Sequence, residues 1–442
     1  MVNDESNKRP VRKLTVKNFS VIKDAELEFG KITVLIGPQA SGKSLLCKLE
    51  YFLSGEIPGI AVESLLDRNS WDEFLQTVDR EFRKRFLTSE TSWTIDHTAV
   101  SFTSYEYAIE LRGAGTLLTA RIEYSFCDVF KNLYSALAGN PAKQLPNISM
   151  SRDELRQNFF VEIGLVLGRN RTQSSTYIPS GRSLFSDTGT SIIALQNPDL
   201  DPITRRFAGL IAWDSRWKAG YLTTGRGVVQ GVEEGIHRIA GGTVSTKDGK
   251  PFFLSDDGRN LPLSVQSSGT LELLPMFNVL DQLACFQEHI YARASAARIS
   301  PIAEISEHSP LVYLEEPEAH IFPEAQYQLV QLLSWVANDP ILDFDWVITT
   351  HSPYILSSFN NLLEAAQVVA VKPELKDEVA KLIPEQYWVK SSEFKAYCIQ
   401  DGKLETIMDA ETGLISGNYL DSVSETIGVE FDELLRLGYV AT

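Results

Sequence analysis

The first apolar segments of the chain lie close together near its N-terminus. They run from Val11 to Phe19, from Ala25 to Phe29 and from Lys31 to Ile36. The third is β-branched and apolar nearly throughout, a pattern typical of a strand buried on both faces in a parallel sheet. Gly37 ends this strand, and a helix is expected to begin near Lys43. The pattern predicts an α/β fold.

The remaining segments change character several times along the chain. Residues 56 to 94 predict short helices, and residues 127 to 170 and 187 to 239 predict longer helical insertions. β-type segments are predicted from Trp93 to Phe126, at Tyr177–Ile178, through a hairpin from Thr243 to Leu263, at Leu311–Leu314 and at Trp346–Thr349. Helices are predicted from near Ser268 and from Pro323 to Ala337, a partial loop over 288 to 309, and a small αβ region from Ala366 onward.

Composition places the chain among ordinary globular proteins, with 43% hydrophobic and 22% charged residues. No apolar run approaches the length of a membrane span, and the polar N-terminus has no signal-peptide core. The four cysteines form no CxxC pair, which argues against a disulfide framework or a zinc site. We therefore expect a cytoplasmic protein without a membrane partner.

The net charge is −17. Nucleic-acid binding without sequence preference depends on basic side chains that neutralise phosphates. The acidic balance therefore argues against a surface that binds DNA all over, although a local basic patch on an assembled oligomer is compatible with it.

A glycine-rich loop follows the strand at Lys31–Ile36. It matches G-x-x-x-x-G-K-[ST] and consists of Gly37, Pro38, Gln39, Ala40, Ser41, Gly42, Lys43 and Ser44. Backbone N–H groups of such a loop surround the β-phosphate of a nucleotide, and the start of the following helix favours the anion. Lys43 neutralises the β- and γ-phosphates, and Ser44 is suited to bind Mg²⁺. The predicted cofactors are ATP and Mg²⁺.

Three further patterns fit a nucleotide site. Leu311–Leu314 places Glu315 and Glu316 at the end of a strand, where one carboxylate suits Mg²⁺ and the other suits activation of water. His351 follows the strand that ends at Thr349, where it could donate to a γ-phosphate. Ser267, Ser268 and Gly269 open a helix and could bind the γ-phosphate of a second subunit. Taken alone, the histidine is more often structural, and the serines fit an ordinary helix N-cap.

The order of these four patterns resembles the ABC ATPases, and more closely their SMC-like and OLD-like branch. The 272-residue separation of Lys43 from Glu315 suits the inserted region of that branch. Three strings add to the resemblance: Lys17-Asn18-Phe19, Tyr177-Ile178-Pro179-Ser180-Gly181-Arg182-Ser183, and Glu315-Glu316-Pro317-Glu318-Ala319-His320. A departure is Glu315, which stands where the family usually has Asp.

The resemblance implies roles for individual residues and a division of the chain. It implies that Lys43, Glu316 and His351 are catalytic, that Ser44 and Glu315 bind the metal, and that Leu45, Asn18 and Phe19 join the phosphate loop and Ser267–Gly269 in binding ATP. It implies an ABC-type P-loop NTPase head with a β-rich lobe and helical insertions. The expected segments are 1–55 and 255–365 for the ATPase core, 56–254 for the lobe and insertions, and 366–442 for a C-terminal αβ region.

The same resemblance extends to partners. Stand-alone ATPases of this kind resemble the ATPase subunits of bipartite phage-defence systems, of the PARIS type and next of the Septu type. This implies a dimer or larger homo-oligomer that shares ATP sites and controls a separate effector, expected to be a nuclease. Two alternatives remain open: a DNA repair or recombination ATPase, and an ATP-gated scaffold that does not hydrolyse ATP. The scaffold would need a defective acidic pair, and Glu316 is present.

Overall fold

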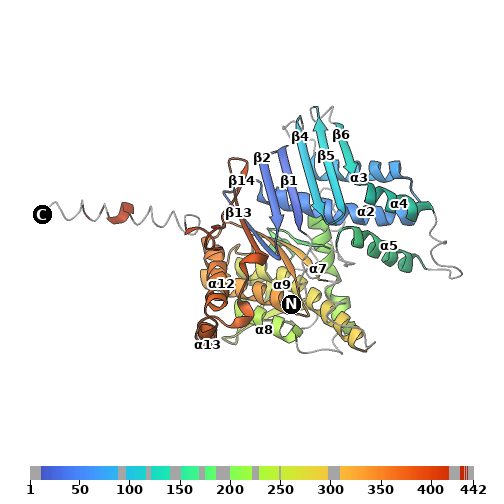
Figure 1. Cartoon of the computed structure of the whole chain (residues 1–442). Coiled ribbons are helices and arrows are strands. Elements are labelled where there is room, and N and C mark those ends of the chain that lie inside the picture. The colour runs from blue at the N-terminus through green and yellow to red at the C-terminus, as the bar shows by residue number, and fades with distance from the viewer. Residues whose placement is uncertain are drawn as a thin grey trace.

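One large sheet organises the protein: helices cover both faces of its parallel half and one face of its antiparallel half (Figure 1). The structure, a computed structural model, describes residues 11–87, 96–115, 121–139, 151–168, 175–185, 200–221, 228–247, 250–296, 309–417, 429–432, 434 and 436. The strands are β1 (Arg12–Phe19), β2 (Ile22–Phe29), β3 (Ile32–Ile36), β4 (Thr98–Ser104), β5 (Tyr107–Ala114), β6 (Arg121–Phe126), β7 (Thr176–Ile178), β8 (Gly242–Lys247), β9 (Lys250–Ser255), β10 (Asn260–Pro262), β11 (Leu311–Glu315), β12 (Asp345–Thr350), β13 (Phe394–Gln400) and β14 (Lys403–Thr406).

The large sheet has an antiparallel half and a parallel half. Its eleven described strands follow the order β6-β5-β4-β1-β2-β14-β13-β3-β12-β11-β7. Strands β6 to β2 pair antiparallel, whereas β13, β3, β12, β11 and β7 pair parallel. A second sheet has the order β10-β9-β8. The mixed α/β class expected from the sequence is confirmed.

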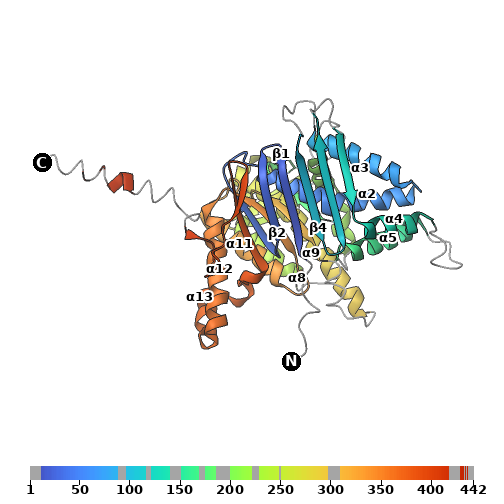
Figure 2. The same cartoon turned by 45° about the horizontal axis from the view of Figure 1, so that its top comes forward.

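The helices lie in two groups (Figures 1 and 2). Helices α2 to α5 lie beside the antiparallel half, and α8, α9, α11 and α12 lie with the parallel half. The α-helices are α1 (Lys43–Tyr51), α2 (Ile57–Leu66), α3 (Trp71–Phe86), α4 (Asp128–Gly139), α5 (Arg152–Val166), α7 (Pro202–Tyr221), α8 (Val228–Ala240), α9 (Ser268–Ala296), α11 (Pro323–Asn338), α12 (Pro353–Val371) and α13 (Lys376–Leu382). Shorter turns are η2 (Phe52–Glu56), η3 (Arg182–Phe185), η4 (Leu263–Val265), η5 (Pro373–Leu375), η6 (Glu385–Tyr387) and η7 (Ser391–Glu393).

The parallel strands separate two hydrophobic cores because successive side chains of a strand point to opposite faces. On β12, Val347 joins the first core, whereas Trp346 and Ile348 join the second. On β3, Leu35 faces the first core and Val34 the second. Burial on both faces explains the nearly continuous apolar sequence of these strands.

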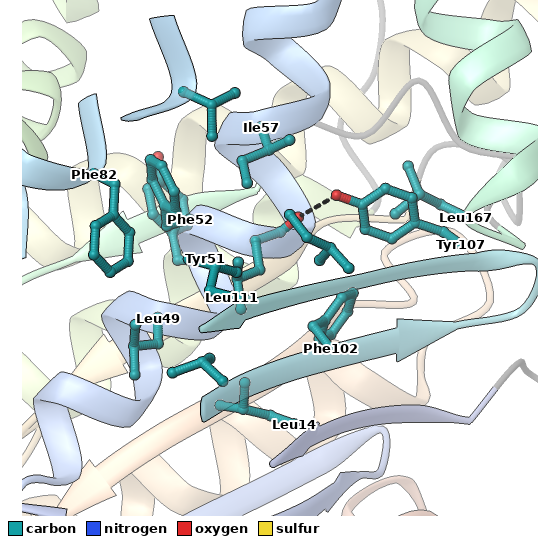
Figure 3. Packing of buried hydrophobic residues seen from close by; sticks show 14 of the residues in the cluster. Leu14, Leu49, Tyr51, Phe52, Ile57, Phe82, Phe102, Tyr107, Leu111 and Leu167 are labelled. Carbon is teal, nitrogen blue, oxygen red and sulfur yellow. Dashed lines mark hydrogen bonds between the residues drawn. The ribbon is translucent and has the colours of Figure 1, made fainter. Parts of the chain in front are cut away.

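The first core fills the space between the antiparallel strands and the helices beside them. Figure 3 shows Phe52 and Phe82 packed near Leu49 and Ile57, with Phe102 and Leu14 from the sheet. The Tyr107 hydroxyl in this core donates to the carbonyl of Leu53 at 3.2 Å, which satisfies its polar atom. This core fixes α1, and with it the loop that precedes α1.

Some segments differ from the sequence-based expectation. The hairpin expected at Thr243–Leu263 is a three-stranded sheet, and α9 continues to Ala296 through residues expected to begin a loop. The C-terminal αβ region contributes β13 and β14 to the large sheet, with β13 directly beside β3. The four expected segments therefore share one sheet, and their boundaries stay a prediction. None of the helices in the described ranges has the length and apolar character that crossing a bilayer requires.

Candidate nucleotide-binding site

Three of the sequence motifs meet at one edge of the parallel half-sheet. β3 ends at Ile36, opposite Thr350 at the end of β12, and Thr349 of β12 lies opposite Glu315 at the end of β11. Because parallel strands present their carboxyl ends at the same edge, the glycine-rich loop, the acidic pair and His351 are neighbours there. Ligands of open α/β sheets bind at this edge.

The glycine-rich loop needs its two outer glycines. Gly37 and Gly42 have φ values of 154° and 108°, which side-chain-bearing residues rarely adopt. A Cβ atom on Gly37 would meet the carbonyl oxygen of Ile399, and one on Gly42 would meet the side chain of Ile22. The loop is therefore held closely between β13 and the turn that joins β1 to β2.

Lys43 lies under the loop and is 5% exposed. Its Nζ donates to the carbonyls of Gly37 at 2.8 Å and Pro38 at 2.9 Å. Burial lowers the pKa of Lys43, while the nearby carboxylates of Glu316 and Glu318 act in the opposite direction. The ammonium group is thus placed between the loop and the acidic residues.

The other loop residues present a cradle of the kind that binds phosphate. Pro38, Gln39 and Ala40 are exposed, and Ala40 has φ 59°. The Ser41 hydroxyl oxygen is buried and has no hydrogen-bond partner among the described residues. Buried polar atoms normally have partners, so an orphan hydroxyl in a loop at a helix start fits a bound anion. The side chain of Leu45 packs against the first core, and its part in nucleotide binding stays a prediction.

Glu315 is held by partners on β7 and the turn after it. Its side chain is buried; Oε1 accepts from the Tyr177 hydroxyl at 2.6 Å, and Oε2 accepts from the Ser180 backbone N–H at 3.0 Å. Burial, followed by the charge of Glu315, raises the pKa of Tyr177, which keeps the hydroxyl protonated as a donor. These bonds accommodate a glutamate where the resembling family usually has the shorter aspartate.

Glu316 lies on the other side of the same turn. Its backbone φ is 43°, and its N–H donates to the carbonyl of Thr349 at 2.9 Å. Its Oε1 is 3.5 Å from Nε2 of His351. The backbone N–H of His351 donates to Glu318 Oε1 at 2.6 Å, so the same acidic loop positions the histidine. The two adjacent carboxylates therefore have different partners, although their catalytic and metal roles stay predictions.

The start of α9 lies against this acidic loop. Ser267 and Ser268 are exposed, whereas Gly269 is buried. A Cβ atom on Gly269 would meet the carbonyl oxygen of His320, so only glycine allows this close packing. The Thr270 N–H donates to Ser267 Oγ at 3.2 Å, as expected of a helix N-cap. The Ser267 hydroxyl therefore caps the helix, whereas the exposed Ser268 takes no part in this cap.

The ring of Phe19 is not available to a nucleotide base, and a contact through its backbone stays a prediction. Phe19 is 1% exposed, and its ring lies in the first core at 6.0 Å from the ring of Phe82 and 5.9 Å from that of Phe86. A ring enclosed by its own core has no face left for a base. Asn18 differs: it is exposed near the end of β1 with φ 50°, and Val21 and Ile22, which follow in the chain, lie against Gly42. Its role in nucleotide binding stays a prediction.

The residues fit Mg²⁺ in the way that nucleotide sites usually bind it. The described residues contain no cluster of three or more His, Cys, Asp or Glu that could hold a metal alone. Nucleotide-bound Mg²⁺ needs only one or two protein ligands together with phosphate oxygens. Burial, followed by the charge of Glu315, raises the pKa of Cys47 on α1. The assignment of Ser44 and Glu315 as metal ligands stays a prediction.

Sequence reasoning missed the residues that support the acidic pair. Arg182 donates to the carbonyls of Glu315 and Glu316 and to that of Glu272 on α9. The carbonyl of Thr349 accepts from the Glu316 N–H, and Glu318 positions His351. The Tyr177–Ser183 string was the available signal, since it contains Tyr177, Ser180 and Arg182, but no spacing indicates what they contact. A separate cavity of about 500 Å³ lies between α2, α3 and α5, and the residues that line it include none of the predicted site residues.

One family model matches part of the chain. Residues 197–356 match a family model described as an AAA ATPase domain. This segment includes Ser267–Gly269, Glu315, Glu316 and His351 but not the glycine-rich loop. A comparison with curated proteins finds no match.

Solved structures similar to this chain include SMC head domains. One is a SmcHead bound to the C-winged helix domain of ScpA, with 11% identity, a TM-score of 0.41, and coverage of 91% of this chain and 98% of that chain. Another is the SMC head domain from Thermotoga maritima, with 11% identity, a TM-score of 0.35, and coverage of 90% and 98%. A third is a Smc head with an extended coiled coil bound to the C-terminal domain of ScpA, derived from Pyrococcus furiosus, with 11% identity, a TM-score of 0.38, and coverage of 90% and 96%. At such scores the interpretation of the site rests on its own geometry.

Proposed function

We propose that this chain is an ABC-type ATPase whose protomers pair around ATP. The observation that carries the proposal is the convergence of the glycine-rich loop, two carboxylates with different partners and His351 at one sheet edge. Phosphate binding alone would need only the loop. The carboxylate of Glu316 beside His351 adds a group that can accept a proton from water.

Each group has a distinct task in this proposal. The loop N–H groups and Lys43 bind the phosphates, and Glu316 orients and deprotonates the attacking water. His351 donates to the γ-phosphate, with its backbone fixed by Glu318. Mg²⁺, when bound near Ser44 and Glu315, supplies charge neutralisation at the β- and γ-phosphates.

Exposed side chains beside the site support pairing with a second copy. Phe322 is 80% exposed and follows the loop on which Gly269 packs, and Tyr354 is 54% exposed three residues after His351. Aromatic rings in water next to a functional edge are typical of interfaces. The exposed Ser268 hydroxyl lies on the same side, where it would meet the γ-phosphate held by the partner.

The proposed biological role is control of a separate protein effector, expected to be a nuclease in bacterial phage defence. It rests on the resemblance to bipartite defence ATPases, and the charge of −17 favours a protein partner over DNA. In this role, ATP occupancy determines whether the effector is held or released. A DNA repair ATPase would instead need a basic groove on the assembled oligomer.

The proposal is tested by measuring phosphate release and molar mass with ATP and Mg²⁺. We expect ATP-dependent phosphate release and an ATP-dependent increase in the mass of the particle. A folded protein that binds ATP but shows neither change would contradict the ATPase proposal. Capture of an effector by the ATP-bound protein, but not by the Lys43→Ala variant, tests the biological role separately.

A further inference from the structure

Arg182 lies at the junction between the acidic pair and α9. It is 0% exposed and begins the turn η3 after β7. Nη1 donates to the carbonyls of Glu315 at 2.6 Å and Pro179 at 3.1 Å, and Nη2 donates to that of Glu316 at 3.1 Å. Nε donates to the carbonyl of Glu272 at 3.1 Å. One guanidinium thus joins both carbonyls of the acidic pair to α9.

The contact with α9 involves the turns next to its exposed start. Glu272 is four residues after Ser268 and so lies on the same helix face. Its carboxylate is buried, with Oε2 at 3.7 Å from Arg182 Nε. Pro275 lies inside α9 and has no N–H for the carbonyl of Leu271, which weakens the link between the first turns and the rest of the helix. The position of these first turns therefore depends strongly on Arg182.

Burial of the Arg182 guanidinium opposes folding, because a charged group loses its hydration. Burial lowers the pKa of Arg182, against the effect of Glu272 and the other nearby carboxylates. Desolvation of such a charge costs several kcal/mol before its contacts compensate. A planar guanidinium can bind several carbonyls in fixed directions, which a lysine ammonium cannot do. The arrangement fits a rigid connection between two elements.

We infer that Arg182 is a positioning residue that couples the two ATP sites of a dimer. This inference rests on the proposed function, in which the start of α9 contacts ATP held by the partner while Glu316 acts on ATP in its own protomer. When the γ-phosphate held by the partner binds Ser268, the first turns of α9 take up a fixed position. Because Arg182 binds the carbonyls of both Glu272 and Glu316, this fixes the position of Glu316 as well. Each site then hydrolyses ATP efficiently only when the other site is occupied.

The test distinguishes a loss of coupling between the two ATP sites from a loss of protein stability. Arg182→Lys keeps the charge and removes the planar set of carbonyl contacts. Arg12→Lys is the matched control, because Arg12 is 7% exposed and pairs with buried Glu50 at 3.1 Å, away from the site edge. Three quantities are measured for each variant: the melting temperature, the Hill coefficient of ATP turnover, and the affinity for a fluorescent ATP analogue. The affinity is measured in a Ser268→Arg background, which blocks pairing.

We expect the wild type and Arg12→Lys to show Hill coefficients above 1, whatever stability Arg12→Lys loses. Arg182→Lys should retain the affinity of the single site, lose cooperativity, and turn over saturating ATP up to about 10²-fold more slowly, because Glu316 is no longer held in its position. Wild-type cooperativity in Arg182→Lys, or the same loss in both variants, overturns the inference.

If Arg182→Lys does not fold, Glu272→Gln serves as the second variant, since it keeps the carbonyl contact and removes the carboxylate charge. A reduced Hill coefficient supports the coupling, and an unchanged one overturns it. A wild type that does not pair with ATP would instead refute the proposed function.

Discussion

Replacement of Glu316 by glutamine should separate ATP binding from ATP hydrolysis. Glutamine keeps the size of the side chain and removes its basicity. The backbone turn should survive, because it is fixed by the bond from the Glu316 N–H to Thr349 and by Arg182. Loss of a general base typically slows a reaction by about 10²- to 10⁴-fold. This corresponds to roughly 3 to 5 kcal/mol in the activation barrier.

The affinity for ATP should not fall in this variant. The carboxylate of Glu316 lies close enough to Lys43 to affect its pKa, and its charge repels phosphate. Its removal should therefore leave the affinity for Mg-ATP equal or tighter, and paired protomers should accumulate with ATP bound. The assay combines single-turnover hydrolysis, calorimetric titration with Mg-ATP and light scattering.

A matched variant shows whether the effect is specific to this position. Glu324→Gln also removes one carboxylate, from an exposed position in the first turn of α11. It should hydrolyse ATP at the wild-type rate. Wild-type turnover in Glu316→Gln would refute the assignment of Glu316 as the base. Loss of ATP binding would show that Glu316 acts mainly in binding ATP and not in activating water.

Three further predictions concern the phosphate loop, the acidic pair and the surface. Lys43→Ala should weaken ATP binding roughly 10- to 150-fold, since charge-assisted bonds contribute about 1.5–3 kcal/mol. Calorimetry measures the affinity and circular dichroism checks folding; wild-type affinity in a folded variant contradicts the assignment of Lys43. Tyr177→Phe should lower the free energy of unfolding by about 1.5–3 kcal/mol, because buried Glu315 loses a hydrogen-bond donor. The control Tyr313→Phe loses only a neutral contact with Ser54 at 3.3 Å and should lower it by about 1 kcal/mol. Urea unfolding measures both values, and equal losses would show that Glu315 does not need the Tyr177 hydroxyl. The purified chain should not bind DNA tightly at physiological salt, given its charge of −17; salt-sensitive DNA binding in a fluorescence anisotropy titration would favour the DNA repair alternative.

The parts of the site that follow from local chemistry were predictable from the sequence. The strand, loop and helix from Lys31 to Tyr51 are indicated by apolar residues followed by two glycines and a lysine at fixed spacing. The acidic pair and His351 could also be placed at strand ends, because each follows a short run of apolar residues. Adjacent parallel strands then bring these ends together.

The contacts that depend on distant segments were not predictable. Arg182 and Glu315 are 133 positions apart, and nothing in the spacing between them indicates a bond. The resemblance of the Lys17-Asn18-Phe19 string placed Phe19 near the nucleotide base, but aromatic residues of α3 enclose its ring. The place of β13 beside β3 depends on long-range pairing between the two ends of the chain.

The two residues at the start of α9 differ in how a substitution there would act on the sharing of ATP sites. A bulky residue at Gly269 would collide with His320 of its own chain, so it would disturb more than the pairing surface. Ser268 is exposed, so Ser268→Arg is the cleaner way to block contact with the partner. Neither Lys43→Ala nor Ser268→Arg should hydrolyse ATP alone.

Mixing these two inactive variants tests the central claim most directly. In a hybrid dimer, the intact phosphate loop of the Ser268→Arg protomer faces the intact α9 start of the Lys43→Ala protomer. One composite site is then complete. Random pairing of equal amounts would restore about a quarter of wild-type turnover if the two sites acted independently, and coupling between the sites lowers the recovery below that limit. Native mass spectrometry confirms that hybrids form while phosphate release is measured. Recovery of activity on mixing is the predicted result, and complete inactivity of proven hybrids would contradict the sharing of ATP between two protomers.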